Sequence, residues 1–99
     1  MTAPTPPYFV SIAPAIVDQL EKLQRRANRQ GRGEAALEAF KEIIHQLQQD
    51  APNVGEPSYG LSSLRLQVRT VAVRPLIVHF AVHEERPIVF INRARLLSQ

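Results

Sequence analysis

The sequence predicts an α+β domain of two layers, in which a hairpin of two helices covers one face of a small, mostly antiparallel sheet. Apolar residues recur at helical spacing through residues 14–49. Residues 64–92 instead contain short alternating or continuously apolar runs, separated by turns rich in proline and charge. A short strand before the first helix completes the expected order, β-α-α-β-β-β.

Size and composition predict one domain with a single core, because the chain has 99 residues. We expect a loose proline-rich tail over residues 1–7 and a single domain over residues 8–99. No apolar run approaches the ~20 residues of a membrane span, and the first residues lack the pattern of a secretory signal. The absence of cysteine excludes disulfides and thiolate metal sites. We therefore expect a cytoplasmic protein with no membrane contact, no metal and no cofactor.

The first half of the chain predicts a strand followed by two antiparallel helices. "YFVSIA" (8–13) alternates as a short strand, and Pro14 suits the first turn of a helix because its missing N–H needs no partner there. The first helix extends to about Gln30, where Gly31 ends it, and the second covers about 34–49. The apolar stripes of the two helices are Ile16, Val17, Leu20, Leu23 and Ala27, then Leu37, Phe40, Ile43, Ile44 and Leu47.

The second half predicts three strands after a long loop. Residues 52–63 contain two prolines and two glycines, which is typical of a loop. Strands are expected over 64–71, 76–82 and 88–92, each bounded by a turn. Residues 93–99 are expected to form a short tail that packs back through its leucines.

The strand expected over 64–71 has two chemically different faces. Its alternating apolar and polar sets are Leu64, Leu66 and Val68 against Arg65, Gln67 and Arg69. Because side chains alternate across a strand, we expect the apolar set to pack beneath the helices and the polar set to lie on the open face. His79 and His83 on the next strand, and Arg93 after the last one, are expected on that same open face.

Positive charge is concentrated at the C-terminal end of the chain. Residues 1–60 hold six Lys and Arg against seven Asp and Glu, whereas residues 61–99 hold six arginines against two glutamates. The planar guanidinium suits phosphate, whereas lysine serves solubility equally well. This asymmetry predicts a polyanionic partner. The candidate RNA- or phosphate-binding residues are Arg65, Gln67, Arg69, Arg74 and Arg95.

Each candidate also has a purely structural interpretation. The strand arginines are also compatible with a solvated face that discourages edge pairing. His79 lies in an apolar run, where a hydrogen-bonded structural histidine is common. Tyr59 is either a packing residue or a proton donor. The basic run "RRANRQGR" (25–32) either contacts RNA or DNA or is a solvated helix end, where the dipole favours cations.

The order of elements resembles that of the RelE/ParE toxin superfamily of bacterial toxin–antitoxin modules. The resemblance covers about Tyr8 to Leu97 and includes the helix hairpin, the "GEP" loop, "LRLQVRTVAVRPLIVHFAV", a charged turn and "IVFIN". The RelE-like branch consists of small basic proteins that enter the ribosomal A site and cleave messenger RNA without a metal. The resemblance implies a RelE-like fold and metal-independent endoribonuclease chemistry, in which the ribose 2′-hydroxyl attacks the adjacent phosphate.

The resemblance also implies roles for individual residues. Arg65 and Arg69 match the basic residues on the first strand of the family's sheet, and Arg93 is similar in place to a second phosphate-contacting arginine. His79, His83 and Arg93 are therefore the candidate catalytic residues. The histidines would be the proton carriers, because they titrate nearest neutral pH and arginine is a poor proton acceptor.

Two departures from the family pattern leave the activity open. RelE-like enzymes place an arginine early in the middle strand, where this chain has Leu76 and Ile77. The C-terminal segment "INRARLLSQ" also lacks the family's tyrosine. A ParE-like inhibitor of DNA gyrase or another topoisomerase, without chemistry, and an inactive toxin-fold interaction module are therefore alternatives.

The resemblance implies two kinds of partner. An antitoxin would cover the basic face or pack on the helix hairpin. The ribosome and its messenger RNA would be the target of the RelE-like activity.

Overall fold

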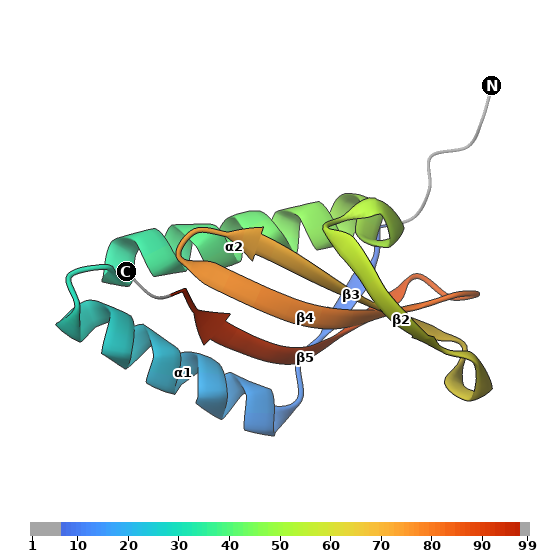
Figure 1. Ribbon diagram of the computed structural model, residues 1–99, viewed down its shortest axis with the longest axis horizontal. Helices are drawn as coiled ribbons and strands as arrows, with labels where there is room; N and C mark the ends of the chain where they lie inside the picture. Colours follow the sequence, from blue (N-terminus) through green and yellow to red (C-terminus); the bar gives the residue numbers. More distant parts are fainter. Residues whose placement is uncertain (1–6, 98–99) are drawn as a thin grey trace.

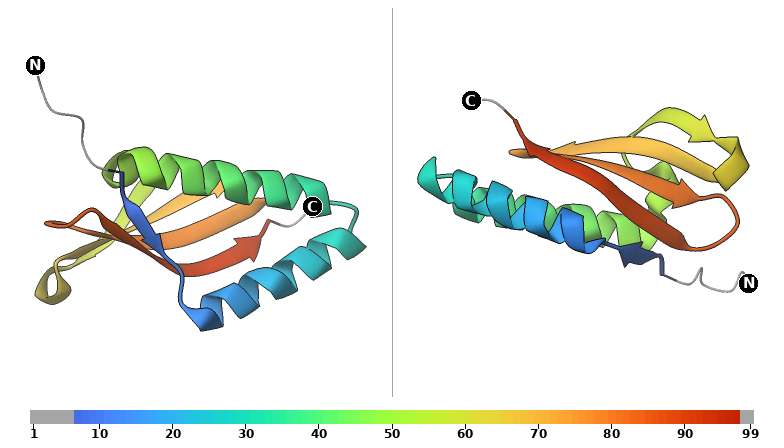
Figure 2. Two further views of the ribbon diagram at one scale, coloured as in Figure 1. Left: turned by 180° about the vertical axis from the view of Figure 1, so that it is seen from behind. Right: turned by 90° about the horizontal axis from the view of Figure 1, so that it is seen from below.

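Two helices pack on one face of a five-stranded mixed sheet, which confirms the α+β, two-layer prediction (Figure 1). The computed structural model describes residues 7–97. The right view of Figure 2 shows both helices on the same side of the sheet, and Figure 1 faces the uncovered side. The elements are β1 (Phe9–Ser11), α1 (Pro14–Arg29), α2 (Gly33–Asp50), β2 (Glu56–Leu61), β3 (Leu66–Val73), β4 (Leu76–His83) and β5 (Ile88–Leu96), with short 3-10 helices η1 (Ala51–Asn53) and η2 (Ser62–Leu64).

The strands lie in the order β1-β5-β4-β3-β2, with β1 parallel to β5 and every other pair antiparallel. The chain order β-α-α-β-β-β-β has one strand more than predicted, because β2 forms within the expected loop 52–63. Proline and glycine in "EPSYGL" indicate a turn, but an edge strand tolerates proline because one row of its backbone groups needs no partner. The last strand also extends to Leu96, through most of the expected tail.

The sequence predicts a loose N-terminal tail and no contact with a membrane. Residues 1–6 of the expected tail lie outside the described residues. Within residues 7–97, neither helix is long and apolar enough to cross a membrane.

A core of aliphatic side chains and one phenylalanine joins the two layers. Val78 and Phe80 on β4 are 0% exposed and pack against the apolar stripes of α1 and α2. The left view of Figure 2 shows α2 lying across the strands that carry these residues. Since side chains alternate along a strand, His79 and Ala81 must point to the opposite, uncovered face of β4.

The faces of β3 are the reverse of those expected from its sequence. Residues opposite each other in an antiparallel ladder share a face, and Arg69 is opposite Phe80, while Val68 is opposite Ala81. Arg69 therefore lies on the helix side and Val68 on the open side. The apolar residues of β3 change phase at Val71, which packs in the core.

Arg65 is not in a strand at all. It follows η2 in a left-handed conformation, with φ of 55°, and β3 begins one residue later. The alternation that included Leu64 and Arg65 in a strand was therefore wrong at its N-terminal end.

Phe80→Ala should lower the free energy of unfolding by about 3–5 kcal/mol, because a fully buried ring would be replaced by a cavity. Urea denaturation measures this change. Phe9→Ala is the control, since Phe9 is 68% exposed and its loss should cost within about 0.5 kcal/mol. Equal losses at the two positions would contradict the packing described here.

Candidate nucleic-acid interface

A row of polar side chains crosses the open face of the sheet from β2 to β5. Thr70 lies opposite His79, and His79 lies opposite Arg93, so the three share this face. The Thr70 Oγ1 and His79 Nδ1 atoms are 3.0 Å apart, and the Ser58 Oγ and Thr70 Oγ1 atoms are 3.2 Å apart. We call Ser58, Thr70, His79 and Arg93 the polar row.

A second row, parallel to the first, carries two aromatic side chains. Tyr59, Val68, Ala81 and Phe90 lie opposite one another in turn across β2, β3, β4 and β5. Val68 and Ala81 form a floor that is nearly closed to solvent, whereas Tyr59 is 59% and Phe90 37% exposed. We call these four residues the aromatic row. On β3 and β4 the two rows are two residues apart, or about 7 Å.

His79 is held in its neutral form by its surroundings. Burial lowers its pKa below the ordinary value of 6.5, and the charges of Arg95 and then Arg93 lower it further. At neutral pH the imidazole therefore keeps one nitrogen lone pair that can accept a proton. The hydrogen bond to Thr70 orients the ring, and Arg93 and Arg95 supply two positive charges beside it.

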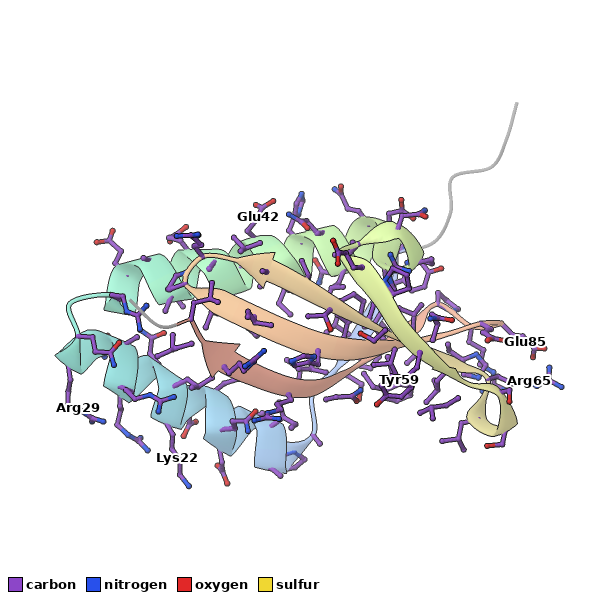
Figure 3. All side chains as sticks on the ribbon, viewed as in Figure 1. Lys22, Arg29, Glu42, Tyr59, Arg65 and Glu85 are labelled. Atoms are coloured by element: carbon purple, nitrogen blue, oxygen red, sulfur yellow. The ribbon has the colours of Figure 1, made fainter. Side chains whose placement is uncertain are left out.

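Three of the predicted phosphate ligands have structural partners instead. The Arg65 guanidinium pairs with the Glu85 carboxylate, and Figure 3 shows the two side by side at the end of the molecule far from α1. Arg69 donates hydrogen bonds to the backbone carbonyls of Val54 (2.8 Å) and Gly55 (3.0 Å). The Gln67 amide donates to the carbonyl of Tyr59 at 3.4 Å.

His83 and Arg74 are also separate from the polar row. The His83 Nδ1 accepts hydrogen bonds from the backbone N–H groups of Glu85 (3.0 Å) and Arg86 (3.1 Å), so this ring stabilises the turn between β4 and β5. Arg74 lies in the turn between β3 and β4, beyond the end of β3. Of the predicted site residues, the structure brings together His79, Arg93 and Arg95.

The sequence alone did not reveal Ser58, Thr70 or Phe90 as part of this face. Ser58 was predicted to lie in a loop. Thr70 belongs to this face because it lies opposite His79, and that pairing is known only from the strand register. The position of Phe90 also depends on the strand register, because its pairing with Ala81 is what places it on the open face.

Comparison with protein-family models, with curated proteins and with solved structures finds no match to this chain. Within residues 7–97, no group of three or more His, Asp and Glu side chains could hold a metal ion.

Arg69→Gln should lower the free energy of unfolding by about 1–3 kcal/mol, because two backbone carbonyls would lose a charged donor. Chemical denaturation of the purified protein measures the loss. Arg74→Gln, which removes the same charge from an exposed turn, should change stability by less than about 0.5 kcal/mol. A destabilisation no larger than that of the control would contradict a structural role for Arg69.

Stability should fall as the pH is lowered through and below 6.5, because the unfolded chain binds a proton at an ordinary histidine whereas folded His79 resists it. His79→Gln should remove part of this loss of stability, as judged from unfolding curves on both sides of that pH.

Arg95→Gln, in a chain that keeps His79, should raise the pKa of His79. An NMR titration of the ring protons of His79 measures this change. An unchanged pKa of His79 in this variant would contradict the proximity of the His79 ring and the Arg95 guanidinium.

Proposed function

We propose that this chain is a RelE-like toxin component of a toxin–antitoxin module, which binds RNA at the ribosome and cleaves it. The observation that carries the proposal is the position of His79 and Arg93 beside the aromatic row on the uncovered face of the sheet. The resemblance of the element order to the RelE/ParE superfamily supports the same function.

The open face offers both kinds of contact that single-stranded RNA needs. Exposed Tyr59 and Phe90 can stack on bases, which is the usual way in which a sheet binds unpaired nucleotides. Arg93 and Arg95 can form charge-assisted hydrogen bonds with the phosphate between those bases. Val68 and Ala81, which lie between the two aromatic residues in the row, are 4% and 2% exposed and form an apolar floor there.

His79 is suited to begin the cleavage. With its proton on Nδ1, the ring donates to Thr70 Oγ1 and Thr70 donates to Ser58 Oγ, which leaves the lone pair of Nε2 free. Nε2 accepts the proton of the ribose 2′-hydroxyl, whose oxygen then forms a bond to the adjacent phosphorus. The arginines neutralise the charge that develops on the phosphorane oxygens.

The reaction is completed when the bond from phosphorus to the 5′-oxygen breaks. Water protonates that oxygen, and His79 returns its proton to solvent, so the products are a 2′,3′-cyclic phosphate and a 5′-hydroxyl. This scheme assigns proton transfer to His79 and charge stabilisation to Arg93 and Arg95. It needs neither the arginine early in the middle strand nor the C-terminal tyrosine that the family pattern includes.

The proposal implies a cytoplasmic location and an antitoxin that restrains the activity. A groove of about 220 Å³ between α1 and α2 is lined by Val17, Leu20, Leu37 and Phe40, and Val17 and Leu37 are 40% and 44% exposed. An amphipathic helix of the antitoxin fits such an apolar groove.

Induction of the protein alone in bacterial cells should stop translation and produce transcripts cut within codons at the ribosome. His79→Gln should slow cleavage by about 100-fold or more, because it removes the proton acceptor. Primer extension on transcripts after induction measures the cuts. Arg86→Gln, an exposed change outside the polar row, is the control and should cleave as the wild type does.

Two other results would overturn this function. DNA damage without cut transcripts indicates a ParE-like inhibitor of a topoisomerase. Unchanged growth with a folded, abundant protein indicates an interaction module without toxic activity.

A further inference from the structure

A groove between α1 and β5 is lined by positive charge from both elements. Its volume is about 510 Å³. The cationic side chains that line it are Lys22, Arg25, Arg26 and Arg29 from α1 and Arg93 and Arg95 from β5. The α1 residues are spaced by three or four positions and so share one side of the helix. In Figure 3 the ends of Lys22 and Arg29 extend from α1 into solvent, away from α2 and from β5.

Within residues 7–97, no carboxylate is paired with the charges in the groove. No carboxylate lines the groove, and the ion pairs within residues 7–97 are Glu38–Lys41 and Arg65–Glu85, both elsewhere. The helix dipole accounts for Arg26 and Arg29, which lie in the last turn of α1, but not for Arg93 and Arg95 on a strand. Like charges that line one groove repel one another where they lie within the ~8 Å range of screening at physiological salt. A bound polyanion would relieve that repulsion.

The groove continues directly from the open face of the sheet. Pairing between β1 and β5 ends at Phe90, so the remainder of β5 has a free edge on that side. Gln19 of α1 accepts a hydrogen bond from the backbone N–H of Ala94 at 3.0 Å, which fixes α1 beside this edge. Arg93 belongs to the polar row and also lines the groove, so the two sites share this residue.

We infer that one RNA strand occupies both sites. Its bases stack on the aromatic row, its reactive phosphate lies at His79 and Arg93, and its backbone then crosses the free edge of β5 and follows the groove along α1. This inference rests on the proposed RNA-binding function and extends it by defining the path of the strand. The groove would hold phosphates without reading bases, so its contribution should be sensitive to salt and independent of sequence.

Binding of short and long RNA to three variants tests the path. The probes are fluorescent oligoribonucleotides of about 4 and about 16 nucleotides, with 2′-O-methyl groups that prevent cleavage. The groove variant is Arg25→Gln/Arg26→Gln/Arg29→Gln. The control removes exposed charges outside the groove and outside the candidate phosphate-binding residues, and is Lys41→Gln/Arg86→Gln. The open-face variant is Tyr59→Ala/His79→Gln. Circular dichroism melts verify that each variant is folded.

The groove variant should bind the long RNA more weakly and lower the slope of log K against log salt by about 2, or about 0.7 for each lost phosphate contact. It should bind the short RNA as the wild type does, since that probe fills only the open face. The control should keep the wild-type slope, and the open-face variant should bind both probes more weakly.

The other outcomes separate the inference from the function. A groove variant that matches the control on both probes, while the open-face variant loses binding, overturns the path and leaves the proposed function standing. An open-face variant that binds both probes as the wild type does overturns the function and the path together. Failure of the wild-type protein to bind either probe would also overturn both the function and the path.

Discussion

The packing of Val78 and Phe80 beneath the two helices determines which side chains of the sheet face outward. These residues are fully buried at the centre of β4, so the phase of that strand is fixed. The antiparallel ladders transmit the phase to β3 and β5, because opposite residues share a face. Thr70, His79 and Arg93 therefore lie together on the open side, and Arg69 is directed to the helix side.

The helices and the layer arrangement could be predicted because their signals are local. Apolar spacing, Pro14 and Gly31 are read within one segment, and the observed bounds of α1 and α2 differ from the predicted ones by one residue. Gly31 has a φ of +72°, as expected for a glycine that ends a helix. The second strand was missed because Pro57 and Gly60 indicate a loop, whereas pairing with β3 makes it an edge strand.

The faces of the sheet could not be predicted from β3 or β4 alone. Leu66 and Val68 favour one phase of β3 while Val71 and Val73 favour the other, and β4 is apolar at almost every position. Which side chains of β3 face the helices depends on where the helices end. Beyond the end of α2, the backbone carbonyls of Val54 and Gly55 need a donor, and a long arginine on the helix side of β3 supplies it. Arg93 and Arg95 on β5 were predicted from their residue type, but their grouping with His79 required the register of β4 and β5.

Two surfaces of different character thus meet at β5. The open face combines exposed aromatic rings with a neutral histidine, and the groove beside α1 concentrates cationic side chains. The proposed stacking and proton transfer need a defined geometry, which the sheet provides through its ladder. Phosphate attraction needs charge more than geometry, which the exposed side of a helix provides.

The most direct test of a nucleic-acid site on the uncovered face is an NMR titration of the isotope-labelled protein with a short, uncleavable RNA strand. The account predicts that amide and side-chain signals of Tyr59, Thr70, His79, Phe90 and Arg93 shift together, with one saturation curve. Signals of Ile43 and Leu47, buried on α2, should stay in place. Shifts confined to the helices, or none at concentrations where other polyanions bind, would contradict it.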